Sequence, residues 1–170
     1  MTTYATLSDL VAAATEGWTE LAQRGTPDGE AHVDPALLKA VATGGDTMAW
    51  DAQQVAVAQA AHARLLDALE RAAKHADTHL YPRYRSQMPL PAELVQGSSL
   101  PDAVAAIALK RLYGTSVPDE VRRGTAWAED YLVSLARGTV SLGGADTQVA
   151  QPTGRMAART RESAFDWSGY

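Results

Sequence analysis

Residues 48–80 read MAWDAQQVAVAQAAHARLLDALERAAKHADTHL, a stretch that contains neither proline nor glycine. Its apolar residues recur three and four positions apart, which is the spacing of one face of an α-helix. At 1.5 Å per residue this helix would be roughly 45 to 50 Å long, longer than a compact domain of this size normally hides. We therefore expect one long helix, capped by Asp46 or Thr47, part of which projects or packs on a neighbour. The apolar stripe comprises Val55, Ala58, Ala61, His62, Leu65, Leu66, Leu69, Ala72 and Ala76.

Two shorter helices are expected before the long one. Thr6 and Asp9 form the capping pattern of a helix start, and apolar residues follow at helical spacing, which predicts one helix over residues 7–25. Asp34 and Pro35 are typical of an N-cap and a first helical position, and the helix that they open should stop at the next pair of glycines.

The residues after the long helix predict a connector and a helical hairpin. Three prolines within residues 81–97 indicate an extended connector, in which Met88 and Leu90 can pack on the core. Helices should follow from about residue 100 to 113 and from about 119 to 137. Because the connection between them is short, we expect these two helices to pack as an antiparallel pair.

The end of the chain differs in composition from the rest. Residues 139–142 could form a short strand, and residues 143–158 are small and polar, which is typical of a flexible linker. Aromatic residues return only after this linker. We therefore divide the chain into a helical domain (residues 1–142) and a flexible linker with a C-terminal docking arm (residues 143–170). The predicted fold is all-α, a small bundle of about four to five helices with one long helix, a helical hairpin and an extended arm.

Composition and charge exclude several classes of protein. The chain has 170 residues, no cysteine and a formal net charge of −5. Disulfide scaffolds, iron–sulfur clusters and thiol catalysis are therefore excluded. The acidic residues are concentrated in residues 1–51, which disfavours a basic nucleic-acid binder. Apolar stretches are short and interrupted, so we expect neither a signal peptide nor a membrane span.

The sequence offers little support for catalysis or cofactor binding. No serine lies in a Gly-x-Ser-x-Gly elbow, and the glycine pairs lack the lysine of a phosphate loop. His75 and His79 lie four residues apart on one helix face, as metal ligands do, but no third ligand stands beside them in the sequence. We therefore predict a non-enzymatic protein with no catalytic, cofactor or metal site. A helical metal-binding protein that uses both histidines is an alternative of another class.

Arg83 and Tyr84 belong to a local basic cluster with an aromatic residue inside it. Such a cluster fits contact with an acidic partner surface; in the alternative interpretation Tyr84 closes the core and Arg83 pairs with Asp77. The tail carries arginines and aromatics, which are typical of interface hot spots, although plain disorder is its alternative. The predicted interface residues are Arg83, Tyr84, Arg159, Arg161, Phe165, Trp167 and Tyr170.

Several stretches, in this order, carry a resemblance to a known family. They are Tyr4-Ala5-Thr6-Leu7-Ser8-Asp9-Leu10; Asp77-x-x-Leu80-Tyr81-x-Arg83-Tyr84 followed by Met88-Pro89-Leu90-Pro91; Ala105-Ala106-Ile107-Ala108-x-x-Arg111-Leu112-Tyr113; Leu132-Val133-x-Leu135-Ala136-x-Gly138-Thr139-Val140-Ser141-Leu142-Gly143; and Thr160-Arg161-Glu162-Ser163. Together they resemble the Mu-like phage neck protein family, which was formerly described as a domain of unknown function. The region of residues 18–59 is longer than the family pattern, so no role is carried over to it.

The resemblance implies a structural virion protein, a head-to-tail connector or adaptor. It implies a homo-oligomeric ring, of twelve copies, between the portal protein and the next neck or tail protein, through which packaged DNA passes without sequence-specific contact. The implied location is the neck of the virion, with the host cytoplasm during assembly and no membrane. A stopper or tail-completion protein of the same virion is the alternative. Because residues 1–51 are acidic, we expect some of these acids to face the DNA channel and repel phosphate weakly.

Overall fold

The computed structural model describes residues 4–144 and residue 146. Within these residues all regular structure is helical and no strand occurs, which confirms the predicted all-α fold. The elements are α1 (Leu7–Ala13), α2 (Trp18–Gly25), α3 (Pro35–Thr43), α4 (Ala52–Tyr84), a 3₁₀ turn η1 (Arg85–Gln87), α5 (Ala92–Gln96), α6 (Leu100–Leu112) and α7 (Asp119–Arg137).

The N-terminal segment forms two helices where the spacing of apolar residues predicts one. Thr6 caps α1 through the expected capping box with Asp9. The chain then breaks at Gly17, whose φ of 54° and ψ of −125° lie where residues with a side chain are strained. The expectation of one helix over residues 7–25 is therefore wrong, because the break lets α1 pack on α6 while α2 packs on α3 and α4.

The long helix is α4, whose 33 residues match the predicted length but not the predicted ends. It begins after Asp51, which forms a capping box with Gln54, and neither Asp46 nor Thr47 caps it. It continues through Pro82 to Tyr84, where a break was expected. Pro82 removes one backbone donor and crowds the carbonyl one turn earlier, but only Arg83 and Tyr84 follow it in α4 before the chain passes into η1.

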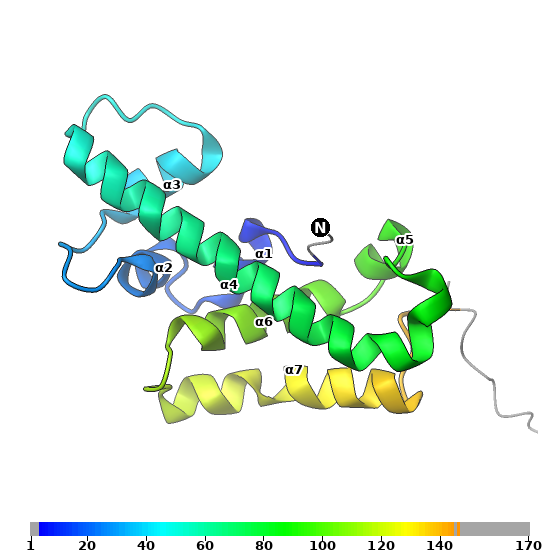
Figure 1. Cartoon of the computed structure of the whole chain (residues 1–170). Helices are drawn as coiled ribbons and strands as arrows, with labels where there is room; N and C mark the ends of the chain where they lie inside the picture. Colours follow the sequence, from blue (N-terminus) through cyan, green and yellow to red (C-terminus); the bar gives the residue numbers. More distant parts are fainter. Residues whose placement is uncertain (1–3, 145, 147–170) are drawn as a thin grey trace, which may run out of the picture.

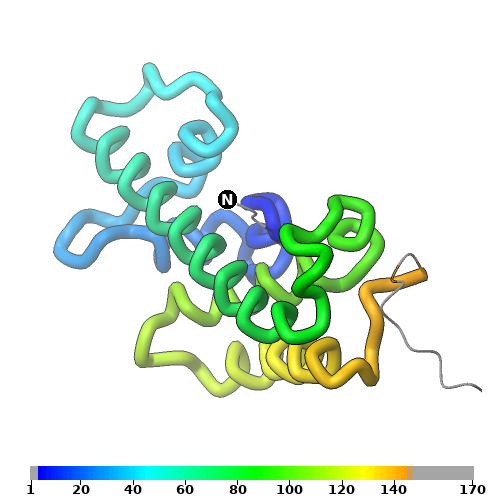
Figure 2. The backbone as a smooth tube through the Cα atoms, turned by 45° about the vertical axis from the view of Figure 1, so that its right-hand side comes forward, coloured from blue at the N-terminus to red at the C-terminus, as the bar shows by residue number. Residues whose placement is uncertain are grey.

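The core lies around α6. Every residue from Ala103 to Leu109 is buried, which is the pattern of a helix covered on all sides. Helices α1, α4 and α7 pack around it, and α6 and α7 form the expected hairpin. In Figure 1, α4 crosses the molecule diagonally, and its N-terminal end reaches α3, away from the α6–α7 hairpin. Figure 2 shows the same extension from another side.

Three smaller expectations need correction. Leu66, placed on the apolar stripe, is 46% exposed. The connector after α4 is not extended throughout, since it contains η1 and α5, although Leu90 is buried and Met88 packs on the core as predicted. Residues 139–142 do not form a strand. The N–H groups of Thr139 and Val140 bond back to the carbonyl of Ser134 at the end of α7, and the described part of the chain offers no strand to pair with.

Candidate functional site

Arg83 and Tyr84, at the end of α4, make their contacts within the protein. Tyr84 is completely buried, and its hydroxyl donates a 2.6 Å hydrogen bond to Oδ2 of Asp146. The Arg83 side chain is 12% exposed, and its Nη1 donates to the carbonyl oxygens of Leu135 (3.1 Å) and Val140 (2.8 Å). These contacts favour the interpretation in which the pair closes the core over the one in which it forms a partner surface.

Asp146 supplies the negative charge of this cluster. Its side chain is fully buried, accepts the N–H of Leu142 at 3.1 Å, and lies 3.8 Å from Nη2 of Arg83. Burial, the hydrogen bond and the charge of Asp146 together raise the pKa of Tyr84 far above its usual range. The alternative interpretation paired Arg83 with Asp77, and that pairing is wrong, because the buried carboxylate beside Arg83 is that of Asp146. Asp146 belongs to the segment whose composition is typical of a flexible linker, and at this residue the segment packs on the core.

Asp77 has a different role, because it holds the N-terminal segment on α4. It accepts a hydrogen bond from the hydroxyl of Tyr4, which also lies 3.8 Å from the sulfur of Met88. Tyr4 is only 4% exposed, and burial together with the bond to Asp77 raises its pKa well above the usual range. The segment that begins at Tyr4 and the segment after α7 are thus both tied to the last third of α4.

The remaining cations of the basic cluster are exposed and largely paired. Arg71 and Lys74 each contact an acidic residue one turn earlier on α4, at 2.7 Å. Arg85 lies 5.9 Å from the ring of Tyr81. Exposed pairs of this kind contribute little to stability and leave no concentrated positive field for phosphate.

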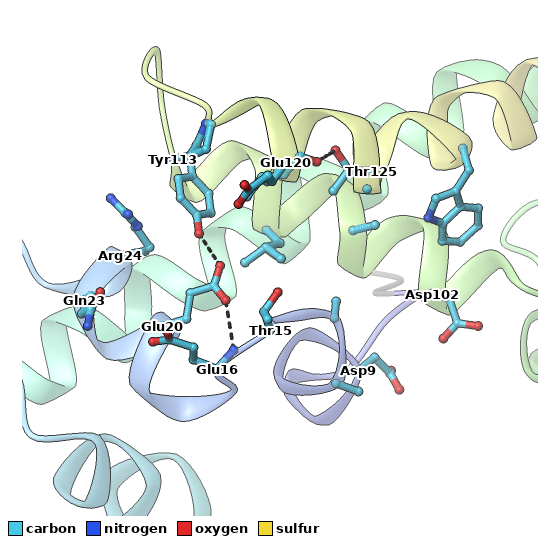
Figure 3. A pocket seen from close by; sticks show the side chains of 18 residues that line it. Asp9, Thr15, Glu16, Glu20, Gln23, Arg24, Asp102, Tyr113, Glu120 and Thr125 are labelled. Carbon is cyan, nitrogen blue, oxygen red and sulfur yellow. Dashed lines mark hydrogen bonds between the residues drawn. The ribbon is translucent and has the colours of Figure 1, made fainter.

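A cleft of about 580 Å³ lies between α1–α2 and the α6–α7 hairpin (Figure 3). Glu20 stands in it as a buried acid that accepts hydrogen bonds from the hydroxyl of Tyr113 and, at 3.3 Å, from the N–H of Glu16. The guanidinium of Arg24 lies 4.2 Å over the ring of Tyr113. Burial and the bond to Glu20 raise the pKa of Tyr113. Acidic residues dominate the charged lining of the cleft, which comprises Asp9, Glu16, Glu20, Arg24, Asp102 and Glu120.

His75 and His79 meet a third side chain of metal-ligand type, Glu129, which is distant from them in the sequence. Nε2 of His75 lies 2.9 Å from Oε2 of Glu129 on α7, and the two imidazole rings stack edge to face with centroids 5.0 Å apart. Lys110 on α6 places Nζ 3.8 Å from the other carboxylate oxygen of Glu129. Burial pushes the pKa of Glu129 upward, but the bond and charge of His75, with Lys110 and His79, hold it below its ordinary value.

The predicted interface residues of the tail lie outside the described part of the chain. They are Arg159, Arg161, Phe165, Trp167 and Tyr170. In the part that is described, no helix combines the length and the apolar character that crossing a membrane requires.

Comparison with known proteins gives the family of the chain. No curated protein and no solved structure matches it. A family model described as Bacteriophage Mu, Gp36 matches residues 4–160, nearly the whole chain, and this confirms the resemblance to a Mu-like phage family. The chain therefore belongs to the Gp36 family of bacteriophage Mu.

Proposed function

We propose that the chain is a head-to-tail connector, an adaptor that forms a ring between the portal protein and the next neck or tail protein of a tailed phage. The observation that carries the proposal is the match to a bacteriophage family over residues 4–160. Its place would be the neck of the virion, after assembly in the host cytoplasm, and its work would be structural and not catalytic.

The exposed apolar side chains of α4 and α7 suit a ring interface. Leu66 and Tyr81 on α4 are 46% and 53% exposed, and Trp127 on α7 is 44% exposed. Large aromatic and aliphatic residues of this kind anchor protein interfaces. In a ring, one patch of each subunit meets a different patch of the next, and exposed apolar side chains on two separate helices are consistent with such a pair. We propose that the ring contains twelve copies.

The acidic cleft supports the second part of the proposal, in which packaged DNA passes without specific contact. Asp9, Glu16 and Glu20 from the N-terminal third meet Asp102 and Glu120 in one region. A surface that carries such acids repels phosphate weakly and lets DNA slide. We propose that some of these acids face the channel of the ring. A reconstruction with all of them on the outer wall would contradict this.

The test is to mix the purified full chain with portal rings of the same phage and to image the product by cryo-electron microscopy. Co-axial ring density on the portal is the expected result. A variant truncated after Gln151 keeps Asp146 and removes the predicted arm, and loss or weakening of the density would assign the arm to docking. Binding to tail components but not to the portal would favour the stopper or tail-completion alternative.

A matched pair of variants tests the interface on α4. Leu66→Glu places a charge on an exposed apolar position and should prevent ring assembly, because a charge inside an interface is costly to desolvate. Gln53→Glu adds the same charge at another exposed position of α4 and serves as the control. Equal assembly of both variants would remove Leu66 from the proposed interface.

A further inference from the structure

We propose that His75, His79 and Glu129 form a binding site for a divalent transition-metal ion, with zinc as the best match. The candidate ligand atoms of the three side chains, two imidazole nitrogens and one carboxylate oxygen, all lie within 4.8 Å of one another. Neither the family match nor the proposed connector function assigns a role to these residues.

The geometry comes from two helices that the core holds in fixed positions. His75 and His79 are one turn apart on α4, so their rings project from the same face, and α7 packs on α4 so that Glu129 faces them. Around a zinc ion at about 2.0 to 2.1 Å, two ligand atoms stand a little over 3 Å apart. Nε2 of His75 and Oε2 of Glu129 lie 2.9 Å apart, slightly closer than this separation, and the candidate ligand atom of His79 lies within 4.8 Å of both side chains. Small side-chain adjustments would therefore bring the three ligand atoms around one ion.

The donor set fits zinc. Two histidines and one glutamate are the protein ligands of many catalytic zinc sites, where a water molecule takes the fourth position. Imidazole also suits nickel, cobalt and copper ions, whereas magnesium and calcium prefer oxygen ligands alone. All three side chains are partly exposed, so an ion can reach them from solvent.

Lys110 carries a positive charge that disfavours a metal ion at this site. Its ammonium group lies 3.8 Å from Glu129 on the oxygen that His75 does not contact, and its side chain is 36% exposed. A metal ion would take the oxygen that faces the histidines and leave the other to Lys110. Removal of this positive charge should therefore tighten binding by roughly two- to fivefold.

A metal at this place would join α4 to α7, one helical turn before Arg83 on α4. An ion that binds only the folded chain stabilises it in proportion to the logarithm of its concentration over Kd. At a hundredfold excess over Kd, the melting temperature of a chain of this size should rise by roughly 5 to 10 °C.

The experiment uses the full chain, freed of metal with a chelator and titrated with zinc chloride by calorimetry and by thermal unfolding. We expect one equivalent of zinc per chain and the rise in melting temperature given above. Cobalt chloride gives an independent readout, because cobalt in a four-coordinate site absorbs visible light much more strongly than hydrated cobalt does. A Kd of roughly 1 mM corresponds to a binding free energy of only about 4 kcal/mol. Absence of a melting shift at roughly this zinc concentration would overturn the proposal.

Variants separate this site from binding elsewhere. His79→Ala and Glu129→Gln should each weaken zinc binding by roughly tenfold or more, and Lys110→Met should strengthen it. His32→Ala removes an exposed histidine before α3 and should bind zinc like the original chain. Each variant is compared with its own metal-free melting temperature, so a change in stability is not mistaken for a change in affinity. Unchanged zinc binding in His79→Ala would overturn the assignment.

Discussion

Replacing Asp146 with alanine should strongly destabilise the protein. The substitution takes away a fully buried carboxylate that accepts the hydroxyl of Tyr84 at 2.6 Å and the N–H of Leu142 at 3.1 Å. It also removes the anion 3.8 Å from Arg83, whose side chain is 12% exposed. Breaking a buried ion pair costs about 3 to 5 kcal/mol, and an unsatisfied buried hydroxyl costs about 1 to 3 kcal/mol.

The two terms sum to roughly 4 to 8 kcal/mol, and we expect the loss of stability to fall at the low end of this range, at about 4 to 5 kcal/mol. The distance of 3.8 Å is long for an ion pair, and Arg83 keeps hydrogen bonds to the carbonyls of Leu135 and Val140. Tyr84→Phe, which removes one hydrogen bond to a charged group, should cost about 1.5 to 3 kcal/mol. Because the two substitutions break the same bond, the double variant should lose less than the sum of the two single losses.

Urea unfolding followed by far-UV circular dichroism at pH 7 measures these free energies. Asp130→Ala, which removes an exposed acid of α7, is the control and should change stability by no more than about 0.5 kcal/mol. A chain truncated after Leu142 should lose as much as Asp146→Ala, whereas a chain truncated after Gln151 should keep the stability that Asp146 provides. A loss below about 1 kcal/mol for Asp146→Ala, or strict additivity with Tyr84→Phe, would refute the role of this cluster.

Two further predictions concern pH and glycine. Folding raises the pKa values of Tyr4, Tyr84 and Tyr113 above the ordinary value of 10.0, so the folded chain holds these protons more tightly than the unfolded chain. Below pH 10 these three tyrosines should therefore not change the free energy of unfolding, which urea unfolding measures. Above pH 10 the free energy of unfolding should fall as the pH rises. A free energy of unfolding that stays constant above pH 10 would contradict the buried hydrogen bonds. Gly17→Ala should destabilise by about 1 to 2 kcal/mol because its φ is positive, whereas Gly124→Ala, inside α7 with open space around it, should stabilise by about 0.5 to 1 kcal/mol. Thermal melts of the two variants that shift in the same direction would contradict this pair.

The helices could be predicted from local patterns because their causes are local. Helix starts and ends depend on capping side chains such as Asp34, on apolar periodicity and on stop glycines, all of which act within a few residues. These signals predicted the bounds of α3, α6 and α7 closely. The break at Gly17 was missed because the apolar spacing continues across it. Pro82 was taken as a helix end, although the helix continues past it for one more half-turn, to Tyr84.

The partners in the candidate sites could not be predicted because they are distant in sequence. Glu129 lies 54 residues after His75, and only the packing of α7 on α4 brings them together. Asp146 lies 62 residues after Tyr84, in a segment whose composition is typical of a linker. A single acid among small polar residues carries no signal of burial until the structure shows the hydroxyl and the guanidinium that it meets.

Contacts within the protein explain most of the motif of residues 77–84, one of the stretches that carry the resemblance to the phage family. Asp77 binds the N-terminal segment, Leu80 is fully buried, and Arg83 and Tyr84 bind Asp146. Tyr81 is the member of this motif that stands 53% exposed. Because the other members serve the fold, Tyr81 is the side chain of this motif that the proposed ring interface can use. Tyr81→Ala should accordingly weaken the proposed ring assembly with little loss of stability, whereas Leu80→Ala should lower the free energy of unfolding by about 2 to 5 kcal/mol. Ring assembly by Tyr81→Ala equal to that of the original chain would contradict this role.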